Sequence, residues 1–263
     1  MQEEIKEFNP LGYKPVGKLL KSLAIPAIIA NLVNALYNVV DQIFIGQGIG
    51  YLGNAATNIA FPIITMCLAI GLTLGIGGAS NFNLELGKGY PEKSKHTAGT
   101  AASTLIIIGI ILCISVRIFL EPLMISFGAT DKILEYSMEY TGITSYGIPF
   151  LLFSIGVNPL VRADGNAKYS MIAIVIGAIL NTILDPLFMF VYNWGIAGAA
   201  WATVISQIIS ASLLLMYFPR FKSVKFSLND FIPQLHYLKR IISLGFASFI
   251  YQFSNMIVLV TTN

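Results

Sequence analysis

Residues 26–42, PAIIANLVNALYNVVDQ, form an apolar segment that carries a line of polar side chains and contains a carboxylate near its end. Asn34, Asn38 and Asp41 are spaced four and three apart, so on a helix they share one face. With its flanks the segment is long enough to cross a bilayer. A carboxylate inside a membrane span is costly and usually marks a functional site. The segment therefore predicts a transmembrane helix whose function involves Asp41.

The composition of the whole chain indicates a membrane protein. Of its 263 residues, 56% are hydrophobic and 11% are charged, whereas roughly 25% of the residues of a soluble domain are charged. The mean hydropathy is +0.74. These values exclude a soluble globular domain and predict a polytopic membrane protein. The net charge of +3 is small and lies mainly on one side of the predicted membrane, so nucleic acid is not an expected partner.

Six apolar stretches are each near or above the roughly 20 residues that a helix needs to cross a bilayer. A seventh begins near residue 240. The N-terminus has no apolar core followed by a small-residue cleavage site, so we expect the first span itself to direct insertion. The fold class is therefore all-α. The six predicted spans cover residues 22–46, 53–82, 98–120, 134–158, 169–192 and 196–218.

Basic residues gather in alternate connections between the spans. Of the 16 basic residues, 14 lie in the N-terminal tail, in the second and fourth loops, or after the sixth span. Arg117 and Lys132 fall on the other side, and we expect Arg117 to reach the membrane interface. By the positive-inside rule the N-terminus is cytoplasmic and the protein is a multi-pass protein of the plasma membrane.

The seventh apolar segment aligns with the first when the chain is shifted by 221 positions, so that Leu23 meets Leu244 and Asn34 meets Asn255. Two parallel halves of six spans occur in several transporter folds. Near the position that corresponds to Asp41, the second copy has Thr261 and Thr262. We therefore divide the chain into a cytoplasmic tail (1–21), a six-helix lobe (22–218), an interlobe linker (219–239) and the start of a truncated second lobe (240–263).

Asp185 is the second carboxylate well inside a span. Asn181 precedes it by four residues and shares its face, and Pro186 loosens the helix beside it. Counted from the outer ends of their spans, Asp41 and Asp185 both lie roughly 10 Å below the outer surface. Two carboxylates close together in an apolar site cannot both ionise cheaply, so one takes up a proton or both share a cation. We expect a proton or sodium site here and no other metal or cofactor.

Other polar or small residues of the spans are candidates for supporting roles. Thr203 and Gln207 of the sixth span are four residues apart, and small residues near them allow a close helix approach. Amides and hydroxyls in membrane helices often only join one helix to another. Pro26 is either a simple kink or a hinge. The supporting candidates are Asn34, Asn38, Asn158, Ala199 and Gln207.

Several longer motifs occur in one order along the chain. They are IP…NALYNVVDQIFIGQ in the first span, ELGKGYPEKSKHTAG in the second loop, then NPLVRADGNAKYSM, ILNTILDPLF and GIAGAAWATVISQ. In this order the chain resembles the N-terminal lobe of a MATE (multidrug and toxic compound extrusion) transporter, followed by the start of its seventh helix. The resemblance implies a twelve-helix transporter, not an enzyme, that exports amphipathic or cationic compounds in exchange for protons or sodium ions.

The resemblance also implies which residues hold the coupling cation. Many prokaryotic members use an aspartate of the first span, an asparagine and an aspartate of the fifth, and a threonine of the sixth. The matching residues in this sequence are Asp41, Asn181, Asp185 and Thr203. The expected partners are small amphipathic or cationic substrates, the lipid bilayer and the missing C-terminal lobe.

Soft apolar side chains are candidates for contacts with such a substrate, because promiscuous binding surfaces are often built from them. The candidates are Tyr37, Met66, Tyr146, Phe150 and Phe153. The two cysteines, Cys67 and Cys113, lie in apolar runs, and we expect both to be packing residues.

Three other functions remain open from the sequence. A lipid-linked oligosaccharide flippase of the same superfamily is expected to have a more basic cavity than these spans provide. An intramembrane aspartyl protease also uses two membrane aspartates, but neither VVD at Asp41 nor ILD at Asp185 fits the GxGD sequence usual in that class. A channel or structural subunit has no evident use for two acids at matched depth.

Overall fold

The computed structural model describes residues 15–262, and over this range the chain folds into helices with no strand. Six spans in this range are long and apolar enough to cross a membrane. The predicted all-α, polytopic fold class is confirmed. Residues 1–14, which include the predicted tail residues Lys6 and Lys14, lie outside the described range.

The first three spans are single long helices, and the fourth is interrupted. The single helices are α2 (Val16–Gly48), α3 (Tyr51–Gly87) and α4 (Pro91–Ile118), and the short α5 (Leu120–Ser126) follows them. The fourth span consists of α6 (Asp131–Thr144), the 3₁₀ turn η2 (Ser145–Gly147) and α7 (Ile148–Ala163).

The fifth span consists of α8 (Ala167–Pro186) and the π turn η3 (Leu187–Val191), and the sixth is α9 (Gly195–Leu215). Two 3₁₀ turns follow, η4 (Phe218–Arg220) and η5 (Leu228–Phe231). The last helix, α10 (Leu235–Thr262), contains the seventh apolar segment.

The helices extend beyond the predicted spans because hydropathy marks only their apolar parts. α4 begins at Pro91 rather than at residue 98, with the proline in the first turn and Glu92 beside the positive helix end. The break in the fourth span and the short α5 were not predicted. The π turn begins directly after Pro186, which has no backbone N–H to continue the α-helical ladder.

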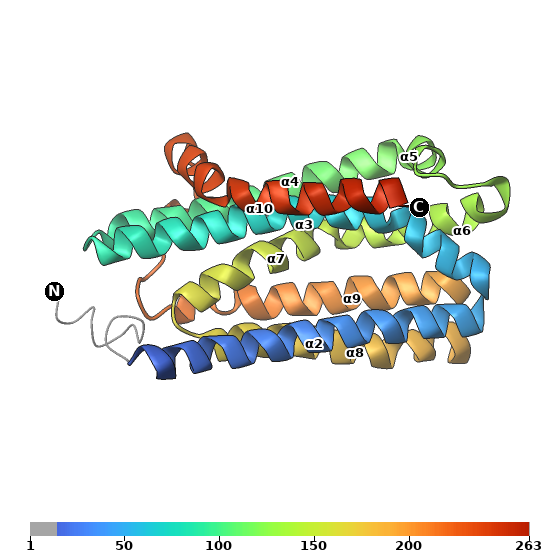
Figure 1. Ribbon diagram of the computed structural model, residues 1–263, viewed down its shortest axis with the longest axis horizontal. Helices are drawn as coiled ribbons and strands as arrows, with labels where there is room; N and C mark the ends of the chain where they lie inside the picture. Colours follow the sequence, from blue (N-terminus) through green and yellow to red (C-terminus); the bar gives the residue numbers. More distant parts are fainter. Residues whose placement is uncertain (1–14, 263) are drawn as a thin grey trace.

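The spans form two groups with α7 between them (Figure 1). α2 packs against α8, and α8 packs against α9, at one side of the lobe. α3 packs against α4 and α10 at the other side, and α7 runs obliquely between the groups in contact with α3, α4 and α9 (Figure 1). This arrangement leaves few contacts between α2 and α3, although the two helices are consecutive.

Glycines allow the closest helix approaches in the second group. A Cβ atom built on Gly75 of α3 would lie 2.5 Å from the carbonyl oxygen of Gly156 in α7. A Cβ on Gly77 would overlap the carbonyl oxygen of Ile241 in α10, and one on Gly245 would overlap that of Thr73. The backbones of α3 and α10 are therefore in direct contact at the Gly77–Gly245 crossing.

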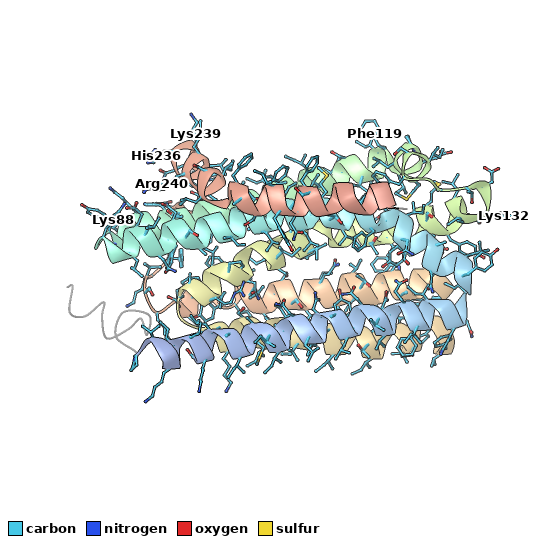
Figure 2. The ribbon with its side chains drawn as sticks, viewed as in Figure 1. Lys88, Phe119, Lys132, His236, Lys239 and Arg240 are labelled. Carbon is cyan, nitrogen blue, oxygen red and sulfur yellow. The ribbon has the colours of Figure 1, made fainter. Side chains whose placement is uncertain are left out.

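The two ends of the lobe differ in their connections. We call the end with residues 88–90, 164–166 and 219–234 the linker end, and the end with residues 49–50, 127–130 and 192–194 the opposite end. Lys88, His236, Lys239 and Arg240 lie towards the linker end and Lys132 lies at the opposite end (Figure 2).

Two buried aspartates attach the linker to the lobe. Asp164, 0% exposed, accepts hydrogen bonds from the Tyr217 hydroxyl at 2.8 Å and from the backbone N–H groups of Lys222 and Ser223 at 2.9 Å. Asp230 of η5 lies 3.7 Å from the Lys95 ammonium and 3.2 Å from Nδ1 of His96 on α4. The predicted linker is thus an ordered part of the lobe surface.

Aliphatic side chains cover the outside of the lobe. On α4, Ile107, Ile110, Ile111 and Ile114 are exposed along one face. Such a surface is unusual for a soluble protein and suits the acyl chains of a bilayer. Cys67 is buried and Cys113 is partly buried, and neither forms a disulfide.

Candidate cation site and lobe chamber

The packing of α2 against α8 brings Asp41 and Asp185 together. The Asp41 side chain is buried, with 7% of its surface exposed, and Asp185 is 0% exposed. Their carboxyl groups lie within hydrogen-bonding reach of each other. Asp41 Oδ1 and Asp185 Oδ2 receive no hydrogen bond from any donor in the described residues. A hydrogen bond between the two groups requires that one of them carry a proton, because an ionised carboxylate only accepts.

Asn181 connects this pair to the sixth span. Its Nδ2 donates to Asp185 Oδ1 at 3.2 Å and to the Thr203 hydroxyl oxygen at 3.3 Å. Asn181 Oδ1 is buried and has no donor within the described part of the chain. The four residues that the family resemblance implied are therefore neighbours, and three of them leave an unpaired oxygen.

Gln42 and Thr57 orient Asp41, and neither role was predicted from the sequence. The Gln42 amide donates to Asp41 Oδ2 at 3.3 Å. The Thr57 hydroxyl of α3 lies 3.2 Å from Gln42 Oε1 and 2.9 Å from the Asn54 carbonyl of its own helix, and it shares its one proton between these two acceptors. Gln42 directly follows Asp41, which was the available signal, but nothing in the spacing of Thr57 pointed to this contact.

Tyr140 of α6 is a second residue that the sequence analysis missed. It is 6% exposed, and its hydroxyl is in hydrogen-bond contact with Thr203. It also lies close enough to Asp41 and Asp185 to interact electrostatically with both carboxyl groups. Tyr140 directly follows Glu139 in a mixed polar stretch, where its spacing gives no signal, so the sequence offered no way to place it at the site.

The chemistry of this site suits a small cation or a proton. Asp41 Oδ1, Asp185 Oδ2 and Asn181 Oδ1 are buried acceptors without donors. Among the described residues, no lysine, arginine or histidine forms an ion pair with either aspartate. An uncompensated buried carboxylate is costly, and hard cations prefer oxygen ligands. A proton shared by the pair or a bound sodium ion would compensate the charge.

A chamber of about 320 Å³ extends from this site towards the linker end, between α2, α3, α7, α8 and α9. Tyr37, Asn181 and Thr203 line it near the aspartates, and Asn158, Arg162 and Ser170 line it near the linker end. Its middle is apolar, with Leu68, Leu72, Leu151, Ile155, Met171 and Ile174. The volume is at the lower end of the range for small-molecule pockets, about 300–1,000 Å³.

The predicted supporting residues lie in different surroundings. Asn34 lines the chamber, whereas Asn38 does not; the Asn38 amide donates to the Asn34 carbonyl at 2.6 Å, and both side chains are exposed. The amide of Asn158 donates to the Ser170 carbonyl at 3.2 Å, far from the aspartates along α7. None of these three asparagines hydrogen-bonds to the aspartates within the described structure.

Ala199, Gln207 and Pro26 have separate positions. Ala199 is 0% exposed and packs among buried residues at the opposite end of the lobe. Gln207 lies between the chamber and a second cavity of about 40 Å³ and lines both. Pro26 lies inside α2 and lines the chamber. A hinge role for Pro26 remains a prediction.

The predicted substrate contacts are mostly outside the chamber. Only Tyr37 lines it. Phe153 is 5% exposed and packs against Phe218 in the core. Met66, Tyr146 and Phe150 are 49%, 46% and 37% exposed on the surface of the lobe. Residue type could not tell which helix face is turned towards the chamber, and substrate contact by these five residues stays a prediction.

Arg117 and Tyr146 join α4 to the break in the fourth span. The Arg117 guanidinium lies 4.1 Å from the centre of the Tyr146 ring, and its Nη1 donates to the Gly142 carbonyl at 2.9 Å. Tyr146 also stacks on Trp201, with ring centres 6.2 Å apart. Arg117 is exposed near the opposite end of the lobe, where it fastens two elements together.

A protein-family model described as MatE matches residues 26–187. The multidrug export protein MepA of Staphylococcus haemolyticus (strain JCSC1435) is 25% identical over 240 residues, covering 89% of this chain and 52% of MepA. MepA of Staphylococcus aureus (strain NCTC 8325 / PS 47) is 25% identical over 238 residues, covering 90% of this chain and 52% of that protein.

Solved structures give the same relationship. An outward-facing multidrug resistance MATE family transporter of the MOP superfamily superposes with a TM-score of 0.85 and 29% identity, over 92% of this chain and 54% of its own. A MOP superfamily transporter from Pyrococcus furiosus gives 0.87 and 28%, over 98% of this chain and 56% of its own. The chain spans about half the length of the curated relatives that it matches, 52% of the first.

Proposed function

The chain belongs to the MatE family, and from this membership we propose that it forms one lobe of a cation-coupled antiporter that exports amphipathic or cationic compounds. Members of the family are membrane transporters and not enzymes, so an intramembrane aspartyl protease is no longer an alternative. The coupling ion in this proposal is a proton or a sodium ion. In this proposal the lobe works together with a second lobe, since the chain spans 52% of the length of its first relative.

The observation that supports this proposal best is the buried pair of Asp41 and Asp185. The pair is held by two different helices and lies beside unpaired oxygen atoms. A purely structural lobe gains nothing from two costly carboxyl groups that no basic residue of the described chain neutralises. A transporter does gain from them, because charge compensation by a cation couples ion binding to conformation.

The proposed mechanism uses differential affinity. A cation from the outside binds at Asp41 and Asp185 while the site is open to the outside, and it favours the state that has released its substrate. Rocking of the lobes then exposes the site to the cytoplasm, where the cation leaves and a new substrate binds. The ion drives transport only to the extent that it binds the two states with different affinity.

The test is Asp41→Asn in the full-length protein, with Asp131→Asn as the matched control, because Asp131 is an exposed acid at the start of α6. Asparagine keeps the shape of the side chain but cannot exchange a proton or balance a cation. We expect Asp41→Asn to reach the membrane normally and to lose drug resistance and dye efflux. Asp131→Asn should retain both.

Dye transport by inverted membrane vesicles, driven separately by a pH gradient and by a sodium gradient, identifies the coupling ion. Undiminished, gradient-dependent efflux by Asp41→Asn would contradict the role of the pair. A flippase of the same superfamily would instead move a lipid-linked sugar in these vesicles without exporting dye.

A further inference from the structure

The lobe chamber carries an unpaired positive charge at one end. Arg162 is half-buried in the last turn of α7 and lines the chamber. Its guanidinium forms no ion pair and no hydrogen bond with any of the described residues. The other basic residues within residues 15–254 are exposed, except Lys95, which pairs with Glu92 and Asp230.

The acids at the linker end are already engaged elsewhere. Asp164, two residues after Arg162, is saturated by Tyr217 and by the backbone of the linker. Glu85 pairs with Lys88 and Arg240, each at 3.4 Å. In the described structure, neither aspartate nor glutamate is among the residues that line the chamber, so Arg162 is its only charged lining residue.

The rest of the chamber suits an apolar tail. Asn158 and Arg162 are four residues apart and share the chamber face of α7, with Ile155 and Leu151 further along the same face. Leu68 and Leu72 of the neighbouring α3 also line the chamber. The hydroxyls of Ser154 and Ser206 also line the chamber, and in the described chain neither has a hydrogen-bond partner.

From this arrangement we propose that the chamber binds an amphipathic organic anion, with its carboxylate or phosphate on Arg162 and its single apolar tail directed towards Tyr37 and Asn181. An arginine stays charged even when partly buried and presents a planar fork that matches either headgroup. The anion site then lies at one end of the chamber, and the cation site adjoins the other end through Asn181 and Thr203. This inference refines the proposed function, because it adds anionic or zwitterionic amphipaths to the substrates that the family resemblance implied.

The test uses a photoactivatable decanoate with a diazirine at the end of its tail, and the full-length protein in phosphatidylcholine nanodiscs without an ion gradient. We expect saturable labelling of the chamber walls at Leu68, Leu72 or Ile155. Unlabelled decanoate should compete at least about tenfold better than nonyltrimethylammonium, which has the same alkyl tail and the opposite charge. Labelling confined to the lipid-facing residues Ile107 and Ile111, or equal competition by both probes, would overturn the proposal.

Substitutions test whether the Arg162 guanidinium itself binds the anion or whether any positive charge at the linker end has the same effect. Arg162→Gln should raise the half-saturating decanoate concentration about tenfold or more, and Arg162→Lys should have an intermediate effect because it keeps the charge without the fork. Lys168→Gln is the matched control, since Lys168 is an exposed cation at the same end that does not line the chamber. Equal effects of Arg162→Gln and Lys168→Gln would count against the site. If Arg162→Gln lowers the melting temperature of the protein, the competition of the two unlabelled probes in the wild type decides whether the chamber prefers an anion.

Two sources of the anion are distinguished by the lipid. If phosphatidylglycerol in the nanodisc suppresses decanoate labelling of the wild type, a lipid phosphate occupies Arg162. If labelling is unchanged, the occupant is a free amphipath. Labelling does not require transport, so Asp41→Asn should still be labelled, and loss of labelling in an active transporter would refute this inference alone.

Discussion

Asn181 holds the candidate cation site together, because its single amide group donates to Asp185 on its own helix and to Thr203 on the next. On the other side, Gln42 donates to Asp41 and is itself held by Thr57 of α3. Each carboxyl group therefore has one oxygen fixed by an amide and one oxygen without a donor in the described structure. Fixed ligands of this kind lower the cost of ordering a site when an ion binds.

Two threonines of α3 provide a test of this support. Thr57 and Thr65 are 6% and 7% exposed, and each donates to a carbonyl of its own helix. Only Thr57 of the two also contacts Gln42. Thr57→Val removes the hydroxyl that orients Gln42, and we expect the half-saturating cation concentration for efflux to rise about two- to tenfold. Thr65→Val should change it little. Identical cation dependence in the two variants would show that Gln42 is not part of the site.

The long helices and the two aspartates could be predicted from the sequence for a physical reason. Hydropathy reports the membrane directly, and a carboxylate in such a span has few roles. Tyr140 and Thr57 could not be found, because their contacts depend on how separate helices cross. Arg162 was predicted to lie in a loop because it is charged and follows the apolar span. In the structure α7 continues to Ala163, and the Arg162 side chain lines the chamber.

At the scale of elements, the crossing of α3 and α10 depends on two glycines whose backbones touch. Gly77→Ala would push a methyl group into the Ile241 carbonyl, and a backbone cannot move aside as a side chain can. We expect this variant to lose about 1–3 kcal/mol of stability through overpacking. The measurement is the apparent melting temperature of the full-length protein in detergent.

Gly87→Ala is the matched control for that change, because it lies on the same helix and a Cβ there meets nothing within 4 Å. Alanine is the better helix former, so this control should be neutral or slightly stabilising. If Gly77→Ala were as stable as Gly87→Ala, α10 would not rest directly on α3.

At the scale of the whole molecule, charge gives the lobe a polarity along its long axis. Lys88, Lys239 and Arg240 lie towards the linker end, and Lys132 lies at the opposite end (Figure 2). The positive-inside rule predicts that the linker end faces the cytoplasm. The proposed transport direction depends on this orientation, since the aspartates lie in the half of the lobe nearer the opposite end.

Single cysteines placed in the full-length protein check this orientation. With Cys67 and Cys113 replaced, Lys222→Cys should react with an impermeant maleimide only in inverted vesicles, since Lys222 is exposed at the linker end. Asn193→Cys, in the exposed turn at the opposite end, should react only in intact cells. The reverse pattern would mean that the aspartates face the cytoplasmic half of the membrane.

The hydrogen bonds of Asp164 have a consequence for biosynthesis. This one carboxylate joins the α7–α8 turn to Tyr217, Lys222 and Ser223, which follow it by 53, 58 and 59 residues. All of these groups precede α10 in the sequence and are therefore synthesised before it. Because domains generally fold in the order of synthesis, the lobe can close and seal its polar groups while later segments are still being translated. Asp164 can then attach the linker to the lobe before α10 is added.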